Sequence, residues 1–128
     1  MLILNFTHPL TNEQLQQTAA LLGIDVDSLK VQNISVHIDR NQALGEVARA
    51  LAEAVELSPT EWQTEPFVVN PPGLAPLALA LIAEIHGRVG HFPTIINIRP
   101  IPNATPVRYE VAELVDLQRQ RDQARKQR

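Results

Sequence analysis

The side chains best suited to chemistry in this chain stand in three short segments beside apolar runs. The first runs from Asn5 to Pro9, the second from Asn70 to Leu74, and the third from Asn97 to Pro100. Between them they contain amide, hydroxyl, imidazole and guanidinium groups that can bind a ligand. If the apolar runs are parallel strands of one sheet, these segments share the carboxyl edge, where open α/β sheets carry their ligand crevice.

The second segment is the most informative, because Gly73 comes just before an apolar segment with helical character. A glycine at that place lets backbone amides approach a ligand closely. The start of the helix adds unpaired N–H groups and partial positive charge. Asn70 adds an amide that can donate or accept. This pattern favours contact with a phosphate or a nucleotide, and the alternative is that Pro71, Pro72 and Gly73 only make a rigid turn.

The other two segments offer weaker candidates. Arg99 has a planar guanidinium that suits a phosphate, although it equally suits a surface carboxylate. His8 is a weak catalytic candidate as a general acid or base, or a hydrogen-bond donor, and its alternative role is to hold its own turn. Hydrogen bonds to a ligand or to the backbone are expected for Asn5, Thr7 and Asn97.

Several well-known chemistries are missing from the sequence. There is no Walker A segment and no G-x-G-x-x-G fingerprint, which excludes the usual ATP and NAD sites. Cysteine is absent and the histidines lack metal-ligand spacing, so we expect no metal. No serine stands in a nucleophile elbow and no paired carboxylates occupy the three segments. We expect no resident cofactor.

The apolar pattern predicts strands that alternate with helices. Strands are expected over Met1–Phe6, Val31–Asp39, Phe67–Val69, Thr94–Ile98 and, at the edge or antiparallel, Val107–Val111. Helices are expected from a Thr11/Gln14 capping box to Gly23, over Gln42–Val55, over Leu74–Arg88 and from Ala112 onward. This order predicts an α/β fold with a mostly parallel sheet of four to five strands flanked by helices.

Length and charge narrow the class of protein further. The 128 residues fit one domain, expected over residues 1–118, with a charged and frayed tail over 119–128. A net charge of −3 disfavours binding to long nucleic acids. No apolar run is long enough to span a bilayer and the first residues do not resemble a signal peptide, so we expect a cytoplasmic protein. The segment Leu74–Ile85 is apolar enough to favour a homodimer, with a central buried helix as the alternative.

Four stretches of the chain resemble a known family. They are Leu2–Thr11, Pro59–Thr64, Ile85–Thr94 and Arg108–Leu114. These stretches are similar to the small Csx-type ancillary proteins encoded beside type III CRISPR systems. The resemblance implies a minimal relative of the CARF domain, a Rossmann-like sensor that dimerises and binds cyclic oligoadenylate across the dimer axis. It also implies that the ligand loops are Asn5–His8, Asn70–Leu74 and Asn97–Arg99.

Three hypotheses about function follow. In the first, a homodimer binds cyclic tetra-adenylate and modulates antiviral signalling by sequestering it, and whether a ring shared between protomers leads to further assembly is left open. In the second, it is a slow, metal-independent ring nuclease in which the ribose 2′-OH attacks the adjacent phosphate. In the third, the Leu74 helix and the charged tail dock on a protein partner. The strand-end segments and the family resemblance favour the first hypothesis. Binding is favoured over cleavage because no convincing general base is visible in the sequence, and the absence of catalytic motifs keeps the third hypothesis open.

Overall fold

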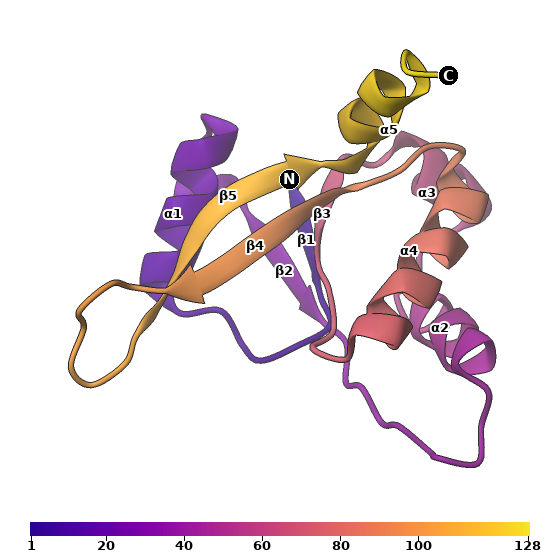
Figure 1. Ribbon diagram of the computed structural model, residues 1–128, viewed down its shortest axis with the longest axis horizontal. Helices are drawn as coiled ribbons and strands as arrows, with labels where there is room; N and C mark the ends of the chain where they lie inside the picture. Colours follow the sequence, from indigo (N-terminus) through magenta and orange to yellow (C-terminus); the bar gives the residue numbers. More distant parts are fainter.

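The computed structural model describes all residues from Met1 to Arg128, and its centre is one five-stranded sheet (Figure 1). The strand order is β2-β1-β3-β4-β5. The strands are β1 (Leu2–Asn5), β2 (Lys30–Asn33), β3 (Phe67–Asn70), β4 (Thr94–Pro100) and β5 (Tyr109–Asp116). The first four are parallel, and β5 pairs antiparallel with β4 at the edge. The fold is therefore α/β and Rossmann-like, with a mostly parallel sheet, as the sequence predicts.

Helices cover both faces of this sheet (Figure 1). The helices are α1 (Asn12–Leu22), α2 (Leu44–Glu53), α3 (Pro59–Thr64), α4 (Ala75–Val89) and α5 (Leu117–Arg125), and a short 3₁₀ turn spans Val26–Ser28. On one face, Leu4 and Val69 pack in a core with residues of α2 and α4. On the other face, Ile3 and Val68 pack in a smaller core that includes leucines of α1. Successive strand residues point to opposite faces, which explains why strands buried on both sides read as continuous apolar runs.

The helices that follow β1 and β3, two neighbouring parallel strands, lie on opposite faces of the sheet. From β1 it continues into α1 on one face, and from β3 it continues into α4 on the other face (Figure 1). Such a divergence leaves an opening at the carboxyl ends of the two strands, and ligands of open α/β sheets bind there. The segments after Asn5 and after Asn70 are those that flank this opening.

Strand β2 is shorter than the sequence predicts, because it ends at Asn33 and not at Asp39. Its only neighbour, β1, ends at Asn5, which is the register partner of Asn33. Beyond that point no strand offers ladder hydrogen bonds, and only Ile34 N still donates to Asn5 O, at 2.8 Å. The alternating apolar residues after Asn33 are buried only in part: Ile34 is buried, whereas Ile38 is 46% exposed.

The end of the chain also differs from the prediction. Strand β4 continues to Pro100 instead of ending at Ile98, and β5 covers Tyr109–Asp116 instead of Val107–Val111. The helix expected from Ala112 begins only at Leu117. The reason is the antiparallel ladder between β4 and β5, which runs the whole length of both strands and includes one register irregularity. Tertiary pairing of this kind overrides the local preference of a segment.

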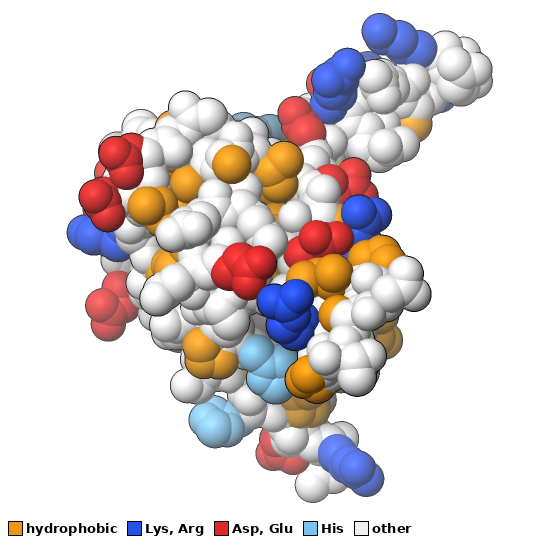
Figure 2. All heavy atoms as spheres, turned by 90° about the vertical axis from the view of Figure 1, so that its left-hand side faces the viewer, with side chains coloured by type: hydrophobic (Ala, Val, Ile, Leu, Met, Phe, Trp, Pro, Cys, Tyr) orange, Lys and Arg blue, Asp and Glu red, His pale blue; other side chains and the backbone are white.

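Helix α5 contains most of the residues that were expected to be frayed, and it continues to Arg125. None of its residues is buried, and it stands apart from the body of the molecule (Figures 1 and 2). Two contacts fix its start: the Asp116 side chain accepts from Arg119 N, and Gln118 Oε1 accepts from Phe92 N at 2.8 Å. No helix in the chain combines the length and apolar character needed to cross a membrane.

Candidate functional site

Three neighbouring parallel strands end on an asparagine at the carboxyl edge of the sheet. Asn5 closes β1 and is the register partner of both Asn33, which closes β2, and Asn70, which closes β3. The side chains of Asn5 and Asn70 are buried, at 0% and 3% exposure. Because strand side chains alternate, these amides lie on the same face of the sheet as Ile3 and Val68, the face that α1 covers.

Asn5 is the hub of this group. Its Nδ2 donates to Asn33 Oδ1 at 2.8 Å and to the backbone oxygen of His8 at 3.0 Å. Its Oδ1 accepts from Asn70 Nδ2 at 3.0 Å and from the backbone N–H of Thr7 at 3.3 Å. One amide therefore uses both donor hydrogens and both acceptor lone pairs. It ties three strand ends to one another and to the loop that follows β1.

The hub also sets the orientation of Asn70. The His8 carbonyl can only accept and the Thr7 N–H can only donate, so they determine which atom of the Asn5 amide is nitrogen and which is oxygen. Asn70 must then offer Nδ2 to Asn5 Oδ1. Its own Oδ1 has no partner within the protein, although the residue is 3% exposed. The one fully buried side-chain atom without a hydrogen-bond partner is Trp62 Nε1, so Asn70 Oδ1 reaches the surface and is an acceptor accessible to a ligand.

Two hollows flank the loop after β1. The first has a volume of about 510 Å³ and the second of about 670 Å³. Four residues border both hollows: Thr7, His8, Pro9 and Gly73. The first hollow is otherwise lined by Phe6, Asn33, Ile34, Ser35, Val36, Ile38, Pro72 and Leu74. The second is otherwise lined by Leu10, Thr11, Gln14, Asn70, Pro71, Ile96, Asn97, Ile98 and Tyr109.

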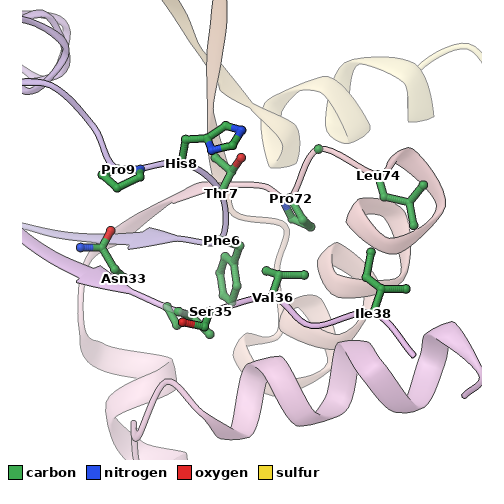
Figure 3. A pocket seen from close by; sticks show the side chains of 12 residues that line it. Phe6, Thr7, His8, Pro9, Asn33, Ser35, Val36, Ile38, Pro72 and Leu74 are labelled. Atoms are coloured by element: carbon green, nitrogen blue, oxygen red, sulfur yellow. The ribbon is translucent and has the colours of Figure 1, made fainter. Parts of the chain in front are cut away.

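Figure 3 shows how the first hollow is built from separate segments. His8 and Thr7 come from the loop after β1, and Pro72 and Leu74 come from the turn before α4. Ile38 belongs to the loop after β2 and lies near Leu74. Both of these apolar side chains are partly exposed, at 46% for Ile38 and 41% for Leu74. The hollow thus has an apolar side and a side of polar groups.

The start of α4 lies at the same place and carries no cap. The N-cap residue Leu74 makes no side-chain hydrogen bond, and the first turn holds no acidic residue. The backbone N–H groups of Gly73, Leu74, Ala75 and Leu77 donate no hydrogen bond within the protein. Pro76 has no N–H at all. The unpaired donors and the helix dipole give this end of α4 partial positive charge, which favours an anion.

The linings of the two hollows are almost free of charge. Neither includes a lysine, an arginine, an aspartate or a glutamate. Attraction for an anion would come from backbone N–H groups, amides and the His8 imidazole. A third hollow of about 530 Å³, near the amino-terminal edge, differs because three carboxylates, of Glu56, Glu61 and Glu65, line it and outnumber its two cationic groups, Lys30 and the Met1 ammonium. Carboxylates repel anions, so the carboxyl-edge hollows are the better candidates for an anionic ligand.

Gly73 borders both hollows and presents only backbone to them. A Cβ atom placed on it would meet nothing within 4 Å, and its φ lies outside the left-handed region. Neither the packing nor the backbone conformation of the fold therefore requires glycine at this position. A missing side chain between two hollows leaves room for a ligand that passes from one to the other, and it lets that ligand approach the backbone.

Most of the residues that the sequence analysis singles out lie together. Thr7, His8, Pro72, Gly73 and Leu74 border the first hollow. The second hollow includes Asn70, Pro71 and Asn97. Asn5 lies beneath them as the hub.

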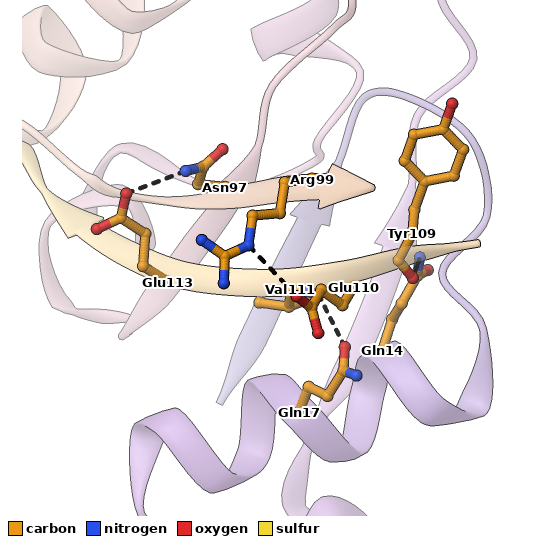
Figure 4. Close-up of polar contacts among 8 residues, drawn as sticks. All are labelled: Gln14, Gln17, Asn97, Arg99, Tyr109, Glu110, Val111 and Glu113. Carbon is orange, nitrogen blue, oxygen red and sulfur yellow. Dashed lines mark hydrogen bonds and ion pairs between the residues drawn. The ribbon is translucent and has the colours of Figure 1, made fainter. Parts of the chain in front are cut away.

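Arg99 is separate from this group, because β4 continues past the expected strand end and carries it along the β4–β5 hairpin. Its Nε lies 3.3 Å from Glu110 Oε1. Asn97 Nδ2 donates across the same two strands to Glu113 Oε1 at 3.0 Å (Figure 4). Arg99 borders neither hollow. The sequence left two roles open for Arg99, a phosphate ligand or the partner of a surface carboxylate, and in the structure Arg99 pairs with the carboxylate of Glu110.

Sequence reasoning missed three residues of the site. The prediction has Asn33 inside a longer strand, although Asn33, like Asn5 and Asn70, stands two positions after an apolar strand residue. Gln14 was assigned only to the cap of α1, but its Nε2 also donates to the backbone oxygen of Tyr109 at 3.2 Å. No local signal places Tyr109 at this edge, because the turn of the β4–β5 hairpin brings it there.

A comparison of the chain with protein-family models, with curated proteins and with solved structures gives no match.

Proposed function

We propose that this protein binds a nucleotide ligand in the crevice between β1 and β3, and that the ligand is a cyclic oligoadenylate, most simply cyclic tetra-adenylate. One observation carries the proposal. The unpaired N–H groups at the start of α4 lie beside Gly73, in the opening where the chain diverges from β1 and β3. Uncapped helix starts at such openings are common phosphate sites in α/β proteins.

The chemistry of the crevice supports a small anion over a long nucleic acid. The backbone donors of Gly73, Leu74 and Ala75 suit a phosphate, and no basic side chain lines either hollow. Long nucleic acids need many cations for their phosphates. The basic residues that gather in the chain stand on α5, away from the body (Figure 2). The resemblance of the sequence to Csx-type proteins supports a cyclic oligoadenylate as the specific ligand.

The choice of tetra-adenylate also depends on symmetry. A ring of this kind has a two-fold axis, so two copies of the protein can each bind one half of it. The exposed side of α4 suits contact with a second copy, because Leu79 is 73% exposed and no charged residue precedes Glu84 in this helix. In this proposal the crevices of the two copies face each other across the axis.

Binding without rapid cleavage is the favoured activity, and it would lower the free concentration of the messenger. His8 is the one histidine that borders the hollows, and it borders both. That position keeps open a slow ring nuclease in which His8 moves a proton of the attacking 2′-OH. No carboxylate or lysine lines the hollows to assist it.

The test uses radiolabelled cyclic tetra-adenylate with purified protein in the absence of metal, analysed on native and denaturing gels. We expect a native shift with intact ligand. A shift followed by linear product that disappears in His8→Ala would replace sequestration by ring cleavage. No shift at micromolar protein would overturn the proposal.

A matched pair of variants tests the place of binding. Gly73→Leu adds a bulky side chain where Gly73 borders both hollows, and Gly87→Leu adds the same side chain at the far end of α4, where a Cβ also meets nothing within 4 Å. We expect both variants to fold, as judged by circular dichroism, and only Gly73→Leu to lose the shift. Equal binding by both variants would place the ligand elsewhere.

A further inference from the structure

The second hollow differs chemically from the first, and this difference suggests what it binds. Its volume of about 670 Å³ lies in the range of small-molecule sites. Its polar groups include the amides of Gln14 and Asn70, and its apolar lining residues are Leu10, Ile96, Ile98 and Tyr109. No lysine, arginine or carboxylate lines it. Amides around an apolar surface suit a neutral, planar group with hydrogen-bonding edges.

Tyr109 has an anchored backbone and a free ring. Gln14 Nε2 donates to its backbone oxygen at 3.2 Å, and Val111 N donates to Gln17 Oε1 at 2.8 Å, so α1 holds the start of β5 (Figure 4). The residue itself is 56% exposed. Its hydroxyl makes no hydrogen bond, and its ring contacts no other aromatic ring. A held backbone with an unoccupied ring face is what base stacking requires.

Asn70 offers a hydrogen-bond acceptor to a ligand in the second hollow. Its Nδ2 is used by Asn5, so the atom that it can offer to a ligand in the second hollow is the acceptor Oδ1. An acceptor selects a donor, and the exocyclic amine of adenine is a donor. The corresponding groups of uracil and guanine are carbonyl oxygens, which repel an amide oxygen. Cytosine also carries an amine, so the choice of adenine over cytosine rests on the proposed function.

We propose that the second hollow is an adenine subsite, in which Tyr109 stacks on the base and Asn70 Oδ1 accepts from its amine. The phosphates then lie on the other side of Gly73, against the start of α4. This inference rests on the proposed function for the identity of the ligand. It adds the specificity-determining residues and divides the crevice into a base side and a phosphate side.

The test compares two variants of Tyr109 with a control on the same hairpin. Val107 is 64% exposed and borders neither hollow, so Val107→Ala is the matched control. In titrations with cyclic tetra-adenylate we expect Tyr109→Ala to weaken binding by about ten- to hundredfold, because stacking on an aromatic ring has that worth per base. Tyr109→Phe and Val107→Ala should bind as the wild type does.

Cyclic tetra-uridylate, which has the same phosphates and a different base, tests the amide. We expect the wild type to bind it more weakly than the adenylate ring, because uracil presents an oxygen to Asn70 Oδ1, and we expect Tyr109→Ala to lose less affinity for it than for the adenylate ring. Equal affinity for the two rings, or a Tyr109→Ala variant that binds like Val107→Ala, would overturn the adenine subsite. Tight binding of the adenylate ring by the wild type would leave the proposed function intact in that case.

A separate measurement covers the case in which no ring binds. The chain contains one tyrosine, so the NMR signals of the Tyr109 ring are resolved without ambiguity of residue. Upfield shifts of these signals on addition of adenosine monophosphate, absent with uridine monophosphate, would support the subsite even if the cyclic ligand were wrong. Unchanged signals with both nucleotides would overturn it.

Discussion

Two helices begin at the same edge of the sheet, and they begin in opposite ways. α1 starts with a complete capping box: Thr11 Oγ1 accepts from Gln14 N at 3.1 Å, and Gln14 Oε1 accepts from Thr11 N at 3.0 Å. α4 starts at Leu74 with no side-chain cap. Both helices follow the central strands β1 and β3. One helix start is satisfied by its own side chains, and the other leaves its donors free.

For the proposed anionic ligand, the difference favours the start of α4 over the start of α1 as the place of the phosphate. An N-cap side chain contributes about 1 kcal/mol to stability, so a helix without one gives up a similar amount. α4 can do without it, because Leu77, Leu81 and Ile85 are fully buried and hold the helix in the core. The missing cap at α4 is consistent with the proposed function, in which a phosphate takes the place of the cap at α4 and not at α1.

The largest expected effect, on the free energy of unfolding, comes from removing the Asn5 hydrogen bonds at the carboxyl edge where both helices begin. Asn5→Ala removes the hub and leaves Asn70 and the His8 carbonyl without their partner. We expect a loss of about 2–4 kcal/mol in the free energy of unfolding, because buried polar groups lose satisfied hydrogen bonds in a network. Denaturant titration measures this.

The control for this variant is Asn41→Ala, since the Asn41 side chain is exposed and makes no hydrogen bond. We expect its stability to match that of the wild type. A change smaller than about 1 kcal/mol in Asn5→Ala would show that the network contributes no more than an ordinary hydrogen bond.

A second variant makes α4 resemble α1. Leu74 has the extended backbone of an N-cap and is 41% exposed, so Leu74→Asp can cap the helix with little loss of apolar contact. We expect the helix to gain up to about 1 kcal/mol from the cap. The affinity for an anionic ligand should fall by about tenfold or more, because the carboxylate occupies the donors and repels the anion.

Leu74→Ser separates these two causes, since it caps without charge. Calorimetric titration with cyclic tetra-adenylate measures both variants. If Leu74→Asp binds as tightly as the wild type, the phosphate does not lie at the start of α4.

A third variant makes α1 resemble α4. Thr11→Ala removes one half of the capping box, and we expect a loss of about 1 kcal/mol in the free energy of unfolding. Ligand affinity should stay within about twofold, because the base in the second hollow is recognised by other side chains. A large loss of affinity with unchanged stability would mean that Thr11, which borders the second hollow, contacts the ligand directly.

The smallest effect is expected at Arg99. Its side chain is 63% exposed and pairs with Glu110 across the hairpin. Exposed ion pairs contribute little, so Arg99→Ala should change stability by at most about 0.5 kcal/mol. We expect no change in ligand affinity. A clear loss of affinity in a calorimetric titration would return Arg99 to the site and contradict the separation between the hairpin and the crevice.

The features that depend on neighbours in the chain were predictable from the sequence. The cap at Thr11, the helix stop at Gly23 and the turn over residues 70–74 all appear where the residue types place them. Gly23 indeed has a left-handed φ of 70°. Helix starts and stops involve groups within about four positions, so a single sequence contains the partners that decide them.

The features that depend on other strands were not predictable in this way. Ile34 and Ile38 have the alternation of a strand, yet β2 stops at Asn33 because its partner strand has ended. Ala112 to Asp116 became a strand, and not a helix, because β4 was there to pair with it. Strand length is set by ladder partners that lie far away in the sequence.

The site shows the same division. The sequence by itself determined the side chains available at the carboxyl edge: Asn5, His8, Asn70 and the bare backbone of Gly73. Only the tertiary structure decided that Asn5 faces inward as a hub, that Arg99 is held by Glu110, and that Tyr109 borders the crevice. A sequence states which groups can form hydrogen bonds, whereas register and sheet order decide which of those groups meet each other and which stay free for a ligand.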